Sequence, residues 1–438
     1  MDPAEGGRLD ECLVALGRLL QRPGFGTGPA TVGAELELFL VDGQGRALPR
    51  NQEVRAETAD PRVVLEIDRF NLELNLPPAP LAGRPFAAMA SELDQALGIV
   101  RRAAAWHGGR VVMVGAILPT LGPGGLEGAN SSFQVHLRVD PDRFADHFNA
   151  AQLATGPVLA VAGNSPTFLG HRLWQETRVA LFKQAVDDRD AAGRSSRRVS
   201  RVAFGTGWTR SGPLELLEES VRLHEPVLPV VGPEQPLDRL DQGDGVPALE
   251  ELRLHQGTVW RWNRAIYDPA DGGHLRIEMR ALPAGPTVTD MLANAAFLLG
   301  LTLALAPGAA TTTRRFAFQQ AHHNFYRAAQ FGLGAELAWP LGPSGRPRPL
   351  PVPELVRHLL PVARQGLEDA GVFAEEAGQL LSVIAARAAS GQTGATWQRL
   401  AVATLEPELG RERALAAMLE RYLDLQRTGE PVHTWPLP

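Results

Sequence analysis

Four short segments of the chain alternate apolar and polar residues, which is the pattern of a β-strand whose two faces meet different surroundings. The segments span residues 33–40, 70–76, 132–139 and 275–281. Because side chains alternate between the two faces of a strand, each segment gathers its polar residues on one side. These residues are Glu35, Glu37, Asn71, Glu73, Asn75, Gln134, His136, Arg138, Arg276, Glu278 and Arg280. If the four strands share one sheet, its polar face holds carboxylates, an imidazole and guanidiniums, which are groups that bind metal ions and phosphate.

A solvated surface is the alternative explanation, since one face of an antiparallel sheet is often exposed to water. Two properties of the four segments favour a functional site instead. Glutamate is depleted in strands, yet it stands inside three of the four segments. The polar positions are also nearly all Glu, Asn, Gln, His and Arg, whereas wet strand faces favour Thr, Lys and Ser. We therefore interpret the chain as an enzyme.

The rest of the chain has mainly helical patterns. Apolar residues at helical spacing predict helices over residues 9–22, 86–107, 144–186 with a break at Gly163, and 214–224. Residues 110–117 have no polar side chain after Arg110, which predicts a buried strand. Beyond Asp290 the whole pattern is helical, apart from a connector rich in Pro and Gly over residues 340–353.

Three segments are predicted to be irregular: the glycine-rich residues 122–128, the charged residues 187–200, and the Pro- and Gly-rich residues 225–244. The glycine-rich segment is followed by a strand pattern and not by a helix, so it fails the test for a dinucleotide-binding loop. We interpret it as a mobile loop beside the site. Strand pairs alternate with helices without strict βαβ order, which favours the α+β class.

A fifth alternating segment covers residues 257–264. Trp260 and Trp262 share one of its faces, and packing in the core is the favoured role for two tryptophans. That choice turns Arg261 and Asn263 toward the polar face of the sheet. The sequence lacks a Ser/His/Asp signature, a phosphate-binding Gly-Lys-Ser/Thr loop and paired zinc-ligand cysteines, so these three kinds of chemistry are excluded.

Composition restricts the environment of the protein. The 438 residues carry a net charge of −6 with mixed signs, which excludes a basic surface for nucleic acid or membrane. The single cysteine, Cys12, excludes an internal disulfide and fits a reducing compartment. The apolar stretch 292–307 is short for a membrane span and predicts a buried helix. No signal peptide is apparent, so we expect a cytoplasmic protein, and a homo-oligomer stays open.

The four strand motifs resemble those of the glutamine synthetase-like carboxylate–amine ligases, and more narrowly those of the second family of glutamate–cysteine ligases. The resemblance is carried by residues 33–37, 71–77, 134–136 and 276–280, and by Asn324-Phe-Tyr-Arg-Ala-Ala-Gln-Phe-Gly-Leu further along. It implies a curved antiparallel sheet of about six strands, with helices on the convex side and the site on the concave side. We interpret residues 1–438 as one domain, with a catalytic portion over 31–335 and a helical C-terminal portion over 336–438.

The same resemblance implies roles for individual residues. Two or three magnesium or manganese ions would be bound by Glu35, Glu37, Glu73, His136 and Glu278, with Glu66 as a further acidic ligand. Arg280 would contact the substrate carboxylate or the transferred phosphate, and Arg178 is a second candidate for that work. Nucleotide or substrate contacts are expected from Gln134, Arg276, Asn324 and Arg327.

The implied reaction is ATP-dependent amide formation through an acyl phosphate, with glutamate as the expected carboxylate and a small amino acid or amine as its partner. The protein needs no nucleophile for this chemistry, because it has only to align the reactants and neutralise charge on the transferred group. Two alternatives stay open. One is a phosphotransferase related to guanidino kinases, which share a related sheet, and the other is a nucleotide- or metal-binding protein without turnover.

Overall fold

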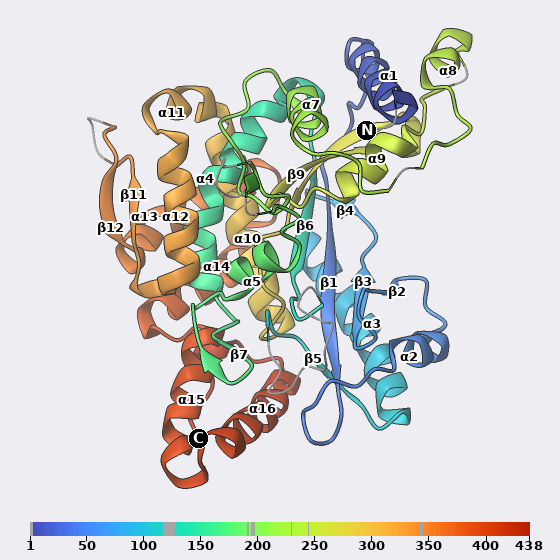
Figure 1. Ribbon diagram of the computed structural model, residues 1–438. Helices are drawn as coiled ribbons and strands as arrows, with labels where there is room; N and C mark the ends of the chain where they lie inside the picture. The colour runs from blue at the N-terminus through green and yellow to red at the C-terminus, as the bar shows by residue number, and fades with distance from the viewer. Residues whose placement is uncertain are drawn as a thin grey trace.

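The computed structural model describes residues 3–116, 128–190, 192–193, 198–228, 230–243, 245–341 and 345–438. The predicted loop at 122–128 lies outside the described residues except for Gly128, and the predicted loop at 187–200 lies partly outside them. Figure 1 shows the strands in the centre of the molecule, with α4, α10, α12 and α13 to the left and α15 and α16 below.

The described residues form one large antiparallel sheet and two small hairpins. The strand order along the main path is β2-β3-β1-β6-β10-β9, and the short strands β4 and β5 also pair with β1. The strands are β1 (Thr31–Val41), β2 (Val63–Leu65), β3 (Asn71–Asn75), β4 (Ala79–Pro80), β5 (Arg110–Val112), β6 (Phe133–Arg138), β9 (Asn263–Asp268) and β10 (His274–Met279). The four alternating segments are therefore the four neighbouring strands β3, β1, β6 and β10, as the sequence predicted.

The register of these strands puts the predicted polar residues on one face. Glu37 pairs with Glu73 across β1 and β3, and Glu278 of β10 pairs with His136 of β6. Directly paired residues point to the same side of a sheet. The apolar residues that alternate with them lie on the other side, where they are buried in the main core: Leu36, Leu38, Leu72, Leu74, Phe133, Val135, Leu137, Ile277 and Met279. We call the side that carries Glu35 and Glu37 the acidic face.

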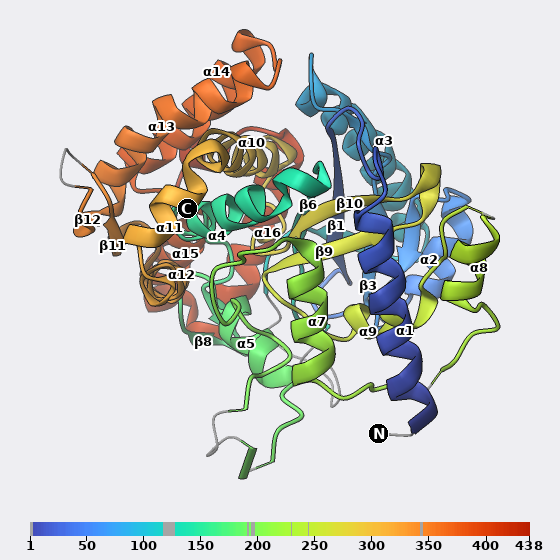
Figure 2. The same cartoon turned by 90° about the horizontal axis from the view of Figure 1, so that it is seen from above.

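Helices cover both sides of the sheet, as Figure 2 shows, with α3 and α10 on one side and α5, α7 and α9 on the other. The helices are α1 (Pro3–Leu20), α2 (Asn51–Thr58), α3 (Pro85–Trp106), α4 (Phe144–Ala162), α5 (Arg178–Ala185), α7 (Pro213–Leu223), α8 (Pro236–Gln242), α9 (Glu250–Gly257), α10 (Val288–Leu305), α11 (Ala309–Arg315), α12 (Phe318–Phe331), α13 (Val352–Asp369), α14 (Ala374–Ser390), α15 (Gly394–Leu409) and α16 (Arg411–Thr428). Phe39 and Val41 extend the face of Glu37 with apolar side chains, which α15 and α16 cover.

The apolar stretch predicted to be a buried helix is α10. It packs against α4, α13 and α14, and the 13 residues from Asp290 to Thr302 are all buried. The stretch Val288–Arg315 is long and apolar enough to cross a membrane, but 72% of its most apolar window is buried inside the protein. Burial against three other helices is the behaviour of a core helix.

Several predicted boundaries were wrong. The region after Asp290 is not entirely helical, because β11 (Glu336–Trp339) and β12 (Arg348–Pro351) form a hairpin across the Pro- and Gly-rich connector. The region 144–186 is divided by the hairpin of β7 (Thr167–Phe168) and β8 (His171–Arg172). The buried strand predicted over 110–117 ends at Val112, and the segment 225–244 contains the short helix α8.

Candidate active site

Two groups of possible metal ligands lie on the acidic face. The first comprises Glu35 of β1, His136 of β6 and Glu278 of β10. The second comprises Glu37 of β1, Glu73 of β3 and Glu66, which directly follows β2. Within each group, one ligand atom from each residue lies within 4.8 Å of the others. Three side chains from three separate strands or loops can therefore surround one ion in each group.

The second group is electrostatically crowded. Burial and the neighbouring Glu35, Glu37 and Glu66 carboxylates raise the pKa of Glu73 to about 10. Burial and the charge of Glu66 raise the pKa of Glu37 to about 7, although Arg280 and Arg178 oppose this shift. Acids that share a buried site cannot all ionise without a compensating cation. This donor set of oxygens fits a hard divalent ion such as Mg²⁺ or Mn²⁺.

The first group is compensated by cations of the protein. Burial opposes ionisation of Glu278, but Arg264, Arg280 and His136 outweigh it and hold the pKa of this carboxyl far below its usual value. Arg264 donates two hydrogen bonds to Glu278, at 2.7 and 3.1 Å, and Arg280 donates one at 3.0 Å. Nε2 of His136 lies 3.1 Å from Glu35 Oε1. Two carboxylates and one imidazole are a ligand set that Mn²⁺ accepts as well as Mg²⁺.

Glu37 is held in place by β6. The backbone N–H of Ser132 donates to one of its carboxylate oxygens at 2.8 Å, and the Gln134 side-chain amide donates to the other at 2.9 Å. Arg280 in turn donates to the carbonyl oxygen of Gln134 at 2.6 Å. A chain of hydrogen bonds therefore links Glu37 to Arg280 and Glu278, so that the acids and the arginine have fixed relative positions.

Arg178, the second predicted arginine, lies at the start of α5 and is buried. Its Nε donates to Glu176 at 3.1 Å, and its guanidinium lies over the ring of Trp262, 5.3 Å from the centroid. Another of its N–H groups donates to the carbonyl oxygen of Ala281, at the end of β10. Arg178 thereby reaches the same cavity as Arg280.

Two cavities adjoin along the acidic face, and Glu35 lines both of them. The larger, of about 620 Å³, contains the second acidic group together with Gln134, Arg178 and Arg280. The smaller, of about 420 Å³, is lined by polar residues from β6 and β10 and from the turn that follows β9. They include His136, Arg138, Asp268, His274 and Arg276. We call these the carboxylate cavity and the polar cavity.

Arg276 belongs to the polar cavity. Its Nε donates to Nδ1 of His136 at 3.1 Å, and its guanidinium pairs with Asp268. The guanidinium therefore lies next to the first group of possible metal ligands, on the side away from Arg178. An arginine here can contact an anionic ligand only from the polar cavity.

Asn324 and Arg327 do not line either cavity of the acidic face, and their predicted contacts with nucleotide or substrate stay a prediction. Both lie on α12 and bond to β11. The Asn324 side chain donates to the carbonyl oxygen of Ala338 at 2.8 Å and accepts from its N–H at 2.9 Å. Arg327 donates to the carbonyl oxygen of Glu336 and packs over Phe331. Their polar groups hold the β11–β12 hairpin to α12.

The prediction for the segment before β9 was right for its two tryptophans and wrong for the residues between and after them. Trp260 and Trp262 line the carboxylate cavity, whereas Arg261 and Asn263 point away from it. Arg261 pairs with Glu219, and Asn263 bonds to Gln152 and Thr155. Trp262 belongs to the main core and Trp260 packs against it, so the predicted core packing of the two tryptophans is confirmed, and only the predicted direction of Arg261 and Asn263 was wrong. Alternation had correctly separated the two faces, but it does not say which one turns toward the site.

Arg264 and Glu176 were missed by the sequence analysis. Arg264 shares a face with Trp262 and pairs with Glu278, so continuing the alternation by two residues would have found it. Glu176 is fully buried beside Arg178, and it lies in a loop without a periodic pattern. Local sequence therefore gave no signal for it.

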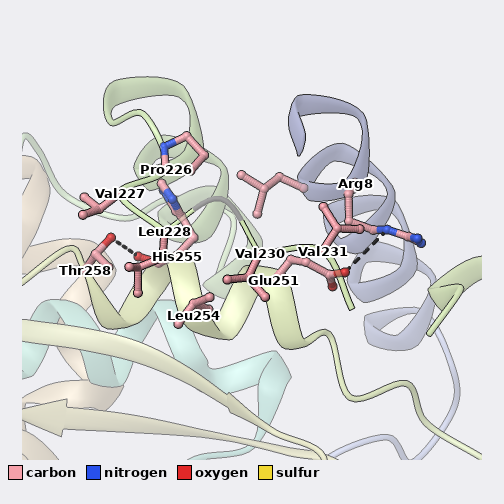
Figure 3. A pocket seen from close by; sticks show the side chains of 11 residues that line it. Arg8, Pro226, Val227, Leu228, Val230, Val231, Glu251, Leu254, His255 and Thr258 are labelled. Carbon is pink, nitrogen blue, oxygen red and sulfur yellow. Dashed lines mark hydrogen bonds and ion pairs between the residues drawn. The ribbon is translucent and has the colours of Figure 1, made fainter. Parts of the chain in front are cut away.

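A third cavity lies away from the acidic face, between α1, α9 and residues 226–228 and 230–231, as Figure 3 shows. Its volume is about 20 Å³, which is room for roughly one water molecule. The Arg8–Glu251 ion pair and the bond from Thr258 to His255 close its sides. A space of this size cannot admit a substrate.

Comparison with known proteins places the fold. No protein-family model matches the chain, and no curated protein matches it. Among solved structures, a glutamate–cysteine ligase from Francisella tularensis in complex with AMP matches with a TM-score of 0.56 and 11% identity, over 94% of this chain and 90% of that one. A bifunctional glutathione synthetase from Pasteurella multocida matches with a TM-score of 0.47 and 12% identity, over 96% of this chain and 55% of that one. The chain therefore has the glutamine synthetase-like fold that the strand motifs predicted.

Proposed function

We propose that the protein is an ATP-dependent carboxylate–amine ligase that forms an amide bond through an acyl phosphate. The observation that supports this most is the convergence of two groups of possible metal ligands with Arg178, Arg264 and Arg280 on one face of the sheet. A phosphoryl-transfer site needs many positive and many negative groups close together, since cations must neutralise the polyphosphate and acidic side chains must bind the metal cations among them. The acidic face has both.

The two cavities suggest how the substrates divide. In this proposal the polyphosphate of ATP enters from the polar cavity, where Arg138, Arg276 and His274 supply donors for phosphate oxygens. The carboxylate substrate occupies the carboxylate cavity, where Arg178 and Arg280 face it. The γ-phosphate and the carboxylate then meet near Glu35, which lines both cavities. Divalent cations bound by the two acidic groups would neutralise the phosphates and polarise the transferred group.

The protein's own part is to align the reactants. A carboxylate oxygen attacks the γ-phosphorus, the bond from phosphorus to the ADP oxygen breaks, and ADP leaves. The amine nitrogen then attacks the acyl carbon, the bond to the phosphate oxygen breaks, and the amine loses a proton. Arg280 stabilises the charge of the transferred group in both steps. It is pre-oriented by Gln134 and Glu278, so little reorganisation is needed during the reaction.

Glutamate is the carboxylate that we propose, in keeping with the resemblance of the strand motifs and with the two arginines of the carboxylate cavity. Mg²⁺ or Mn²⁺ is the proposed ion, and the reaction is proposed to take place in the cytoplasm on small molecules. A guanidino-kinase-like transfer uses the same charges but makes no amide. No arrangement on the acidic face favours it over ligation.

A pairwise screen tests the proposal. Purified protein is incubated with ATP, Mg²⁺ or Mn²⁺, one carboxylate such as glutamate, and one amine, and released phosphate and product mass are measured. We expect phosphate release that requires both substrates and yields an amide with the mass of the two less one water. A phosphorylated acceptor without free phosphate would assign a kinase. Absence of ATP turnover across a broad panel of amino acids and amines would contradict the proposal.

A further inference from the structure

The outer part of the carboxylate cavity is apolar, in contrast to its charged floor. Phe182 of α5 and Trp260 line one side, and Leu65 and Ile67 line the opposite side, on either side of Glu66. Leu65 is 44% exposed and Ile67 is 66% exposed, which is high for large aliphatic side chains beside a charged site. Exposed apolar residues gathered around a cavity commonly mark a binding surface.

The two aromatic residues have fixed positions relative to the arginines. Phe182 follows Arg178 by four residues on α5, so both side chains lie on one face of the helix, one turn apart. The ring of Phe182 packs edge-on against both tryptophans, with its centroid 6.0 Å from that of Trp260 and 6.1 Å from that of Trp262. Trp262 is only 2% exposed and already supports the Arg178 guanidinium. Phe182 and Trp260 are therefore the aromatic surfaces that this wall offers to a ligand.

We propose that the amine substrate carries an apolar or aromatic side chain, which packs between Phe182 and Trp260 on one side and Leu65 and Ile67 on the other. This inference rests on the proposed ligase function. The carboxylate and the transferred phosphate have to lie against Arg178 and Arg280, and the amine nitrogen must reach the acyl carbon there. The remainder of the amine substrate then extends outward, one helical turn beyond Arg178, where the cavity walls are apolar.

The position of the phosphate-binding donors supports the same assignment. The adenine ring of ATP is the other flat group that such a wall could hold. The phosphate-binding donors Arg138, Arg276 and His274 lie on the other side of Glu35, in the polar cavity. Phe182 and Trp260 do not line that cavity, so the KM for ATP in a Trp260 variant separates adenine from the amine substrate.

The test uses the carboxylate identified by the pairwise screen and three amine substrates: phenethylamine, methylamine and cysteine. Wild-type protein should have a kcat/KM for phenethylamine at least about 10-fold above the values for methylamine and cysteine. Trp260→Ala should lower kcat/KM for phenethylamine at least about 10-fold more than it lowers kcat/KM for methylamine, with no rise in KM for ATP. Trp106→Ala is the matched control, because Trp106 is 82% exposed at the end of α3 and lines none of the three cavities. Ile67→Ser, at an exposed position that folding does not depend on, should act in the same direction as Trp260→Ala.

Three outcomes would overturn the inference and leave ligation intact: a preference of the wild type for methylamine or cysteine, an equal loss for all amines in Trp260→Ala, or a raised KM for ATP in that variant. The last would assign the wall to adenine. Absence of turnover with every pair contradicts the proposed function itself. Calorimetric titration then still decides the inference, because phenethylamine should bind wild type more tightly than methylamine does and lose that advantage in Trp260→Ala. Equal binding of the two amines, or no binding, would overturn it.

Discussion

Glu37 of β1 and Glu73 of β3 are directly paired across the sheet, so two carboxylates face each other at the closest spacing that strand pairing allows. Like charges opposite one another destabilise a sheet, and Glu66 brings a third carboxylate within 4.8 Å. The protein without bound cations accommodates this by keeping protons, as the raised pKa values of Glu37 and Glu73 indicate. A divalent cation relieves the same repulsion and replaces the protons.

The stability of the metal-free protein should therefore fall with rising pH. An ordinary glutamate in the unfolded chain loses its proton near pH 4.5. In the folded chain Glu37 keeps its proton up to about pH 7 and Glu73 up to about pH 10. Because the folded state binds more protons than the unfolded state in this range, the free energy of unfolding falls as the pH rises. Denaturation of metal-free protein from pH 5 to 9 should show this decline, and Mn²⁺ should reduce it. Glu73→Gln should flatten the decline and weaken the Mn²⁺ effect, whereas Glu408→Gln, at an exposed position, should change neither.

Arg280→Ala should abolish nearly all amide formation. The side chain is bonded to Gln134 and Glu278 and faces the carboxylate cavity, so its loss removes a positive charge from the transferred group. Removing one group that stabilises the charge of a transition state lowers kcat on the order of 10²- to 10³-fold. Glu37→Gln should have an effect of similar size on turnover. Circular dichroism confirms folding, and wild-type turnover in either folded variant would remove that residue from the mechanism.

Glu176→Gln tests whether Arg178 is held by its buried partner. The substitution keeps the side-chain volume but leaves the buried guanidinium without its carboxylate. Removing one member of a buried ion pair costs about 3–5 kcal/mol in the free energy of unfolding. We expect a lower denaturation midpoint together with a raised KM for the carboxylate substrate, since Arg178 loses its fixed position. An unchanged KM would mean that Arg178 does not contact that substrate.

Asn324→Ala tests whether Asn324 holds the β11–β12 hairpin or binds the nucleotide. Asn324 satisfies both backbone groups of Ala338, and leaving buried groups without partners costs about 1–3 kcal/mol each. The variant should therefore lose stability in chemical denaturation and keep the wild-type KM for ATP. A large rise in this KM with unchanged stability would return Asn324 to the nucleotide site.

Much of the acidic face could be predicted because strand alternation is a local property. Once Glu35 and Glu37 are on one side of β1, register with β3 and β6 determines which residues are their neighbours. Glu66 shows the limit of this reasoning, because it directly follows β2 outside any alternating pattern. Only the resemblance suggested it. Its position beside Glu37 and Glu73 depends on how the chain turns between β2 and β3.

Other features depended on partners far along the chain. Arg261 and Asn263 turn away from the acidic face because Glu219, Gln152 and Thr155 meet them in the interior. No local pattern contains that information. The β11–β12 hairpin was missed for a related reason, since β11 ends just before the Pro- and Gly-rich connector, β12 lies within it, and the hairpin is held to α12 by Asn324.

The most direct test of the central claim is anomalous diffraction from crystals of the full chain grown with Mn²⁺ and a non-hydrolysable ATP analogue. We predict one manganese peak within Glu35, His136 and Glu278, and a second within Glu37, Glu66 and Glu73, with the phosphates of the analogue near Arg276. Absence of manganese from both groups in crystals that contain the bound analogue would contradict the account.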